Sequence, residues 1–101
     1  MRKSKIVCAG ICNTKSAEIR YLAEQVSVFG AEPLIMDLSL GGAVDWADVT
    51  LAEVLAATGL SVDAVYAAPR AEAIQMVGRA AAKTVLRMHA EGRCDGIISW
   101  A

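Results

Sequence analysis

The residues best suited to chemistry lie in one short polar turn near the N-terminus, within the stretch "GICNTKS". The turn follows the apolar run "KIVCA" and precedes an amphipathic segment, so it should join a strand to a helix. Backbone N–H groups at a helix N-terminus attract anions. Lys15 would add positive charge there, and Thr14 a hydroxyl for a phosphate or a metal ion. Together with Gly10, Asn13 and Ser16, these residues form a candidate phosphate-binding turn.

The same turn has a simpler interpretation, in which the side chain of Asn13 or Thr14 only caps the helix. The glycine-rich fingerprint of dinucleotide-binding folds is absent from this stretch. Taken alone, the residue pattern therefore favours capping and leaves phosphate binding open.

Asp37 is the second candidate, at the end of the apolar run "EPLIMD". It follows the turn by about twenty residues, the spacing at which an acidic residue binds the ribose in dinucleotide folds. The alternative is an ordinary turn aspartate before "LSLGG". Two further residues have mainly structural interpretations: Arg70 could reach a phosphate but is expected on the surface, and Trp46 could stack on a purine but is more typical of a core or an interface.

Several classes of site are disfavoured by composition. The chain has three cysteines, Cys8, Cys12 and Cys94. The odd number and the absence of a C-x-x-C pair argue against a disulfide framework or a zinc knuckle. The chain has one histidine, so a His-rich metal site is excluded. The sequence shows no nucleophile paired with a histidine base and no convincing pair of carboxylates. No set of catalytic residues is therefore predicted, and whether the chain has enzymatic activity stays open. The three thiols are expected to be structural, although Cys12 lies in the turn itself.

Net charge and hydropathy argue against two classes of binding partner, nucleic acids and membranes. A net charge of −1 gives no electrostatic case for nucleic-acid binding. No apolar run reaches the roughly 20 residues that span a bilayer, and the N-terminus does not resemble a signal peptide. We therefore expect no membrane association and a cytoplasmic location.

The elements that must position the turn alternate along the chain. Strands are predicted over 5–11, 32–38 and 94–101, from short apolar runs. A helix after the turn has one apolar stripe that Phe29 should extend, with Gly30 as its end. A short helix begins at Thr50, where Thr50 and Glu53 form a capping box, and stops at Gly59.

The remaining segments are less uniform. The pattern predicts a loop over residues 39–48, and a loop or a brief extended piece over residues 60–69. A long alanine-rich helix runs from residue 70 to about 91, and its predicted buried stripe consists of Ile74, Val77, Ala81, Val85 and Met88.

This alternation predicts an α/β fold, a Rossmann-like three-layer half-domain with three parallel strands, flanking helices and strand order 2-1-3. The first and third strands would then be neighbours, and ligands bind at that switch point. An apolar third strand at the edge favours a single truncated or split domain over 1–101. We expect a homo-oligomer or a C-terminal partner chain to cover this edge.

Four stretches in order resemble the N-terminal part of the Tm-one-like ATP-binding domain family, the tomato mosaic virus resistance protein type. "VCAGICNTKSAEIRYLAEQV" is similar to the family's opening strand, turn G-T-x-D-T-K-G-E-E-L and helix, matching it at Gly10, Thr14, Lys15 and Glu18. "IMDLSLGG", "DVTLAEVLAATG" and "AAKTVLRMHAEGRCDGIIS" resemble the segments that follow.

The resemblance implies that the chain binds ATP, with or without magnesium. The phosphates would lie at the turn and the sugar near Asp37, so that the implied site residues are Gly10, Asn13, Thr14, Lys15, Ser16 and Asp37. It favours nucleotide binding over simple capping. The alternative is a non-catalytic assembly module, or one half of a split enzyme that pairs with a C-terminal partner chain.

Several positions depart from the family pattern. Asn13 stands where the family has aspartate, which removes one negative charge and a magnesium contact. Ser16 replaces a glycine, which restricts how closely the backbone approaches a phosphate. Residues 69–71 read Pro-Arg-Ala where Asp-Arg-Gly is usual, and the family's later G-G-x-x-G-T turn would fall after Ala101.

Overall fold

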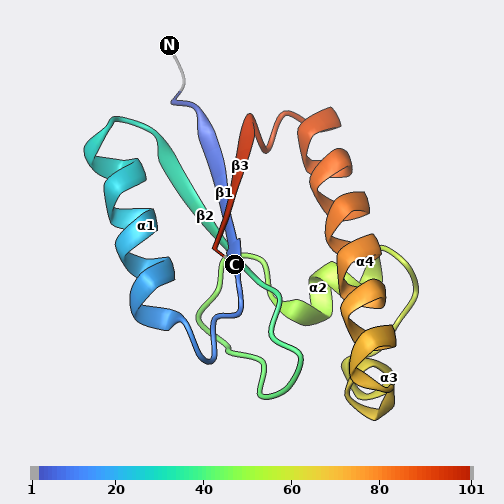
Figure 1. Ribbon diagram of the computed structural model, residues 1–101. Coiled ribbons are helices and arrows are strands. Elements are labelled where there is room, and N and C mark those ends of the chain that lie inside the picture. The colour runs from blue at the N-terminus through green and yellow to red at the C-terminus, as the bar shows by residue number, and fades with distance from the viewer. Residues whose placement is uncertain (1–2, 101) are drawn as a thin grey trace.

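The structure is a computed structural model that describes residues 3–100, and it contains one sheet of three parallel strands (Figure 1). These are β1 (Lys5–Gly10), β2 (Glu32–Asp37) and β3 (Gly96–Trp100), in the order β2-β1-β3. The predicted fold class and strand order are therefore confirmed.

The central strand β1 pairs along its length with both neighbours. Its register runs from Lys5 opposite Glu32 to Gly10 opposite Asp37, and on the other side Gly10 lies opposite Trp100. Residues 7–10 are buried, as expected of a near-continuous apolar run between two covered faces. All three strands thus end at the same edge of the sheet.

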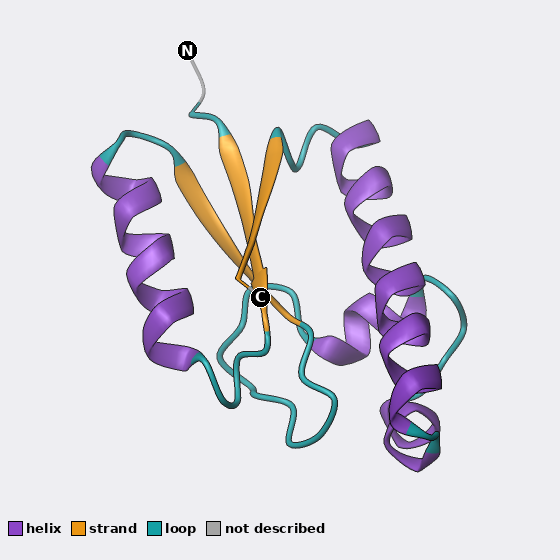
Figure 2. Ribbon diagram, in the orientation of Figure 1, coloured by secondary structure: helices purple, strands orange, loops and turns teal. Residues whose placement is uncertain are grey.

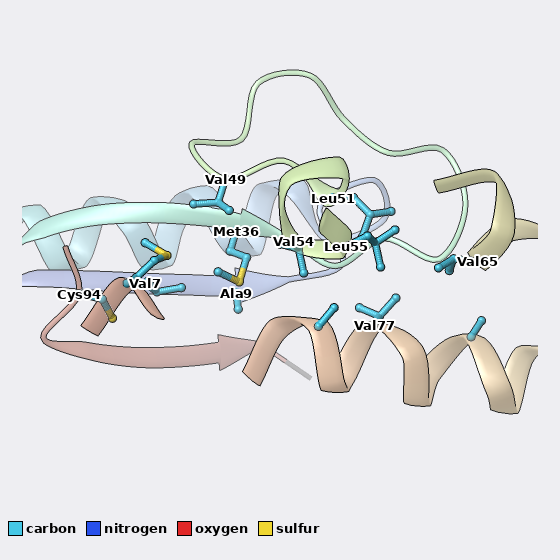
Figure 3. Close-up of a cluster of buried hydrophobic side chains, with 13 residues drawn as sticks. Val7, Ala9, Met36, Val49, Leu51, Val54, Leu55, Val65, Val77 and Cys94 are labelled. Atoms are coloured by element: carbon cyan, nitrogen blue, oxygen red, sulfur yellow. The ribbon is translucent and has the colours of Figure 1, made fainter. Parts of the chain in front are cut away.

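Helices cover both faces of the sheet, giving three layers (Figure 1). Helix α1 (Ser16–Val28) packs on one face, where Cys8 contacts the cluster that holds Ala23 and Val26. On the opposite side of the sheet lie α2 (Leu51–Ala56) and α4 (Arg70–Ala90), and α3 (Val62–Ala67) packs against these two helices. The larger core cluster there joins strand, α2 and α4 side chains (Figure 3), among them Val7, Ala9, Met36, Leu51, Val54, Leu55 and Val77.

The predicted helix boundaries hold where capping residues define them. Thr50 and Glu53 form the expected capping box at the start of α2, with the Glu53 N–H donating to Thr50 Oγ1 at 3.3 Å. Gly30 and Gly92 follow α1 and α4 with φ of 89° and 75°, a left-handed backbone that suits glycine.

Two expectations about local structure were wrong. Residues 60–69 are neither loop nor strand: they contain α3, whose first turn is capped by Ser61 Oγ, which accepts the Ala64 N–H at 3.1 Å. Phe29 does not extend the buried face of α1, because it lies at the end of the helix and is 85% exposed.

The buried face of α4 is rotated by about one residue from the predicted stripe. Its buried residues are Ala73, Val77, Ala80, Thr84 and Met88, whereas Ile74 is half exposed. Small side chains let α4 lie close to α2, and the Thr84 hydroxyl lies 3.2 Å from the Val54 carbonyl oxygen of α2 and 2.8 Å from the Ala80 carbonyl oxygen. The face of α4 that carries small side chains and the hydrogen-bonded Thr84 hydroxyl is therefore the face that is buried against α2.

The two edges of the sheet differ. Residues 48–49 lie along β2, where Val49 O accepts the Asp37 N–H at 3.0 Å and the Val49 N–H donates to Ile35 O at 2.9 Å. At the other edge, the outer side of β3 pairs with no strand among residues 3–100, and Ile97 and Ile98 are 51% and 42% exposed.

Candidate anion-binding site at the carboxyl ends of the strands

The turn after β1 and the long loop after β2 lie beyond the carboxyl ends of the strands (Figure 2). The turn is tight, because Ile11 O accepts the N–H groups of both Thr14 and Lys15, at 3.2 and 2.9 Å. Helix α1 then begins at Ser16, beside the switch point between β1 and β3.

The N-terminus of α1 has no side-chain cap. The N-cap residue is Lys15, and its side chain forms no capping hydrogen bond. The alternative interpretation, in which Asn13 or Thr14 caps the helix, is therefore wrong. The first N–H groups of a helix have no partner within it, so those at the start of α1 are available to an anion.

Asn13 fastens the turn to the loop instead of capping the helix. Its backbone N–H donates to Ser39 Oγ at 3.2 Å, and its side-chain amide donates to the Gly41 carbonyl oxygen. Gly42, with φ of 69°, suits this contact, because a Cβ there would lie 3.3 Å from Asn13 Nδ2.

Asp37 holds the loop from the inside of the protein. It is fully buried, and its Oδ1 accepts the Ser39 N–H at 2.9 Å and the Ser39 hydroxyl at 2.5 Å. Its Oδ2 accepts the Val44 N–H at 3.0 Å. Ser39 in turn contacts Asn13, so the carboxylate orders both the loop and the turn. A contact between Asp37 and a sugar stays a prediction.

A hollow of about 170 Å³ lies between the turn, the loop and the start of α4, and its walls are Ile11, Asn13, Thr14, Leu40, Gly41 and Arg70. The structure thus brings together Asn13 and Thr14 from the predicted set and adds Arg70, which is exposed as expected and also lines this hollow. The signal for Arg70 is positional: it is the first residue of α4 and so lies at the carboxyl end of the sheet.

The other predicted residues surround this hollow without lining it. Gly10 is buried at the end of β1, and its carbonyl oxygen accepts the Leu38 N–H at 2.9 Å. Lys15 is exposed, with its Nζ 3.9 Å from Glu18 Oε2, and Ser16 is half-buried as the first residue of α1.

Cys12 is inert in spite of its place in the turn. It is fully buried, and its Sγ lies 3.6 Å from the Gly10 carbonyl oxygen. Burial raises the pKa of the Cys12 thiol to about 12, and the charge of Asp37 adds to the shift. Cys8 and Cys94 are buried as well, so the structural interpretation of the thiols is confirmed.

Trp46 is held by α1. The Arg20 guanidinium lies 4.1 Å from the centroid of its ring, a cation–π contact that fastens the loop to α1. A purine that stacked on the same face of this ring would have to displace Arg20.

Residues 3–100 contain neither a metal-ligand cluster nor a helix suited to span a membrane. No group of three or more His, Cys, Asp or Glu side chains is placed to hold a metal ion. Within the same residues, no helix has the length and apolar character needed to cross a bilayer.

Comparison with known proteins gives one result. A family model described as the N-terminal domain of an uncharacterised protein family, UPF0261, matches residues 4–101. No curated protein matches the chain.

Proposed function

The chain belongs to the uncharacterised protein family UPF0261, so its function has to be inferred from the site. We propose that the chain binds a nucleotide, whose phosphates lie at the turn formed by residues 11–16. The proposed ligand is ATP, with or without magnesium. The resemblance of "VCAGICNTKSAEIRYL" to the opening of the Tm-one-like ATP-binding domain supports this choice.

The observation that carries the proposal is the uncapped N-terminus of α1 beside the hollow of about 170 Å³, here called the polar hollow because Asn13, Thr14 and Arg70 line it. The helix has 13 residues, so its N-terminal N–H groups and dipole favour a negative charge. Two exposed cations flank the position, Lys15 from the turn and Arg70 from α4. A phosphate group there would meet N–H donors, positive charge and the Thr14 side chain in one place.

Each residue has a distinct role in this proposal. Lys15 and Arg70 supply charge, and the Thr14 hydroxyl binds a phosphate oxygen or a magnesium ion carried by the phosphates. Asn13 holds the turn against the loop. Gly10 and Ser16 bring the end of β1 and the first N–H of α1 to the phosphate, and Asp37 keeps the loop in place.

Calorimetric titration with ATP and magnesium tests the proposal. The Lys15→Ala variant should bind ATP about 5- to 150-fold more weakly, the effect of one lost charge-assisted hydrogen bond. Lys83→Ala is the matched control, because Lys83 is an exposed lysine on α4. Equal affinity of the Lys15→Ala, Lys83→Ala and unmodified chains would refute the assignment of phosphate to the turn.

A second candidate function is assembly, and the open edge of β3 favours it. Ile97 lies opposite Val7 and Ile98 opposite Cys8, so the two exposed isoleucines point to opposite faces of the sheet. A second copy, or a C-terminal partner chain completing a split enzyme, would cover both. In native mass spectrometry an oligomer should persist without ATP and be lost in Ile97→Lys. A monomer at all concentrations would contradict assembly of copies.

A further inference from the structure

A second hollow adjoins the polar one at the carboxyl end of the sheet. Its volume is about 210 Å³, and its walls are all apolar or glycine: Ile11, Leu38, Leu40, Ile74, Val77 and Gly78. Ile11 and Leu40 also line the polar hollow, so the two hollows are neighbours.

The apolar hollow follows the first turns of α4. Val77, one of its walls, is buried and points from α4 toward the sheet and α2 (Figure 3). Ile74 is 51% exposed at the rim. Gly78 leaves space beside it, because a Cβ built there meets no atom within 4 Å. The half-exposed Ile74 that the stripe prediction placed in the core thus belongs to this hollow.

We propose that the apolar hollow holds the base of the nucleotide, while its phosphates lie in the polar hollow. This inference rests on the function proposed above. A nucleotide has an anionic part and a flat ring with apolar faces, and the two neighbouring hollows differ in the same way, one lined by Asn13, Thr14 and Arg70 and the other by apolar side chains and a glycine. The ring would lie between Leu40 of the loop and Ile74 and Gly78 of α4.

This placement gives the ligand a direction. The base lies toward α4, not over the end of β2, where Asp37 is fully buried and both its oxygens already accept hydrogen bonds from the loop. It also assigns α4 two roles, since Arg70 meets the phosphates one turn before Ile74 meets the ring.

The test compares two probes, ATP with magnesium and inorganic tripolyphosphate with magnesium, by calorimetry on the full chain. The variant is Gly78→Leu, which fills the hollow from an open position and replaces a helix-destabilising glycine, so the fold should be retained. Ala82→Leu is the control, because it adds the same side chain at an exposed position of α4 outside the hollow.

The unmodified chain should bind ATP at least about tenfold more tightly than tripolyphosphate, from burial of the ring. Gly78→Leu should lose that preference and keep its affinity for tripolyphosphate, whereas Ala82→Leu should keep both. Equal binding of the two probes by the unmodified chain, or undiminished ATP preference in Gly78→Leu, overturns the base site and leaves the phosphate site standing. Absence of binding by either probe overturns both.

Discussion

The hydrogen bonds of Asp37 predict a specific loss of stability in Asp37→Asn. The carboxylate is fully buried and accepts three hydrogen bonds, two from Ser39 and one from Val44. An asparagine can keep its oxygen toward Ser39, but its amide nitrogen then faces the Val44 N–H, donor against donor. The variant therefore loses one charge-assisted bond and leaves an N–H without its acceptor.

The magnitude follows from these losses. A hydrogen bond to a charged group contributes about 1.5–3 kcal/mol, and an unsatisfied buried donor costs about 1–3 kcal/mol. Removing a buried charge offsets part of this cost. We expect the free energy of unfolding to fall by about 1–3 kcal/mol, which lowers the urea midpoint by about 1 M for a chain of this size.

The assay is urea unfolding, combined with amide hydrogen exchange. The control is Asp45→Asn, which makes the same charge change at an exposed position of the same loop and should stay within about 0.5 kcal/mol of the unmodified chain. In Asp37→Asn, exchange should accelerate most at the Val44 amide. If Asp37→Asn unfolds at the same urea concentration as Asp45→Asn, the carboxylate does not hold the loop and the reasoning fails.

Three further predictions concern the loop after β2, the Cys12 thiol and α4. Gly42→Ala should lower the free energy of unfolding by about 1 kcal/mol or more, because φ is 69° and the added Cβ would crowd Asn13. The control Gly41→Ala should be near neutral in the same urea titration. Equal effects of the two substitutions would contradict the role of Gly42. Folding raises the pKa of the Cys12 thiol from 9.0 to about 12. The free energy of unfolding should therefore not depend on this thiol below pH 9 and should fall between pH 9 and 12, where only the unfolded chain releases the proton. A Cys12→Ala variant should show a shallower fall, and rapid alkylation of the folded chain at pH 8 would refute the burial. Thr84→Val should cost about 1 kcal/mol through the lost hydroxyl contact with Val54, and a calorimetric melting temperature equal to that of the unmodified chain would exclude this role.

Local sequence patterns were enough to predict the layers and the strand order. Apolar runs, the Thr50–Glu53 capping box and the glycines after α1 and α4 act within a few residues, so they can be recognised one segment at a time. The short helix α3 was missed because the Ser61 cap was outweighed by neighbouring residues that are typical of strands.

The site was less predictable because its contacts join distant segments. Asn13 contacts Ser39 and Gly41, which lie 26 and 28 residues further along the chain. No local pattern distinguishes an Asn13 that caps a helix from one that fastens a loop. Arg70 likewise reaches the hollow only because the strand order places the start of α4 at the carboxyl end of the sheet.

The unequal edges of the sheet restrict how copies can associate through it. Residues 48–49 occupy the outer side of β2, so a strand of another copy could join there only after displacing them. Head-to-tail addition of β3 to β2, which would propagate into an open filament, is therefore disfavoured. Pairing of β3 with β3 across a two-fold axis uses up the open edge of both copies. Association through this sheet should consequently stop at a closed dimer.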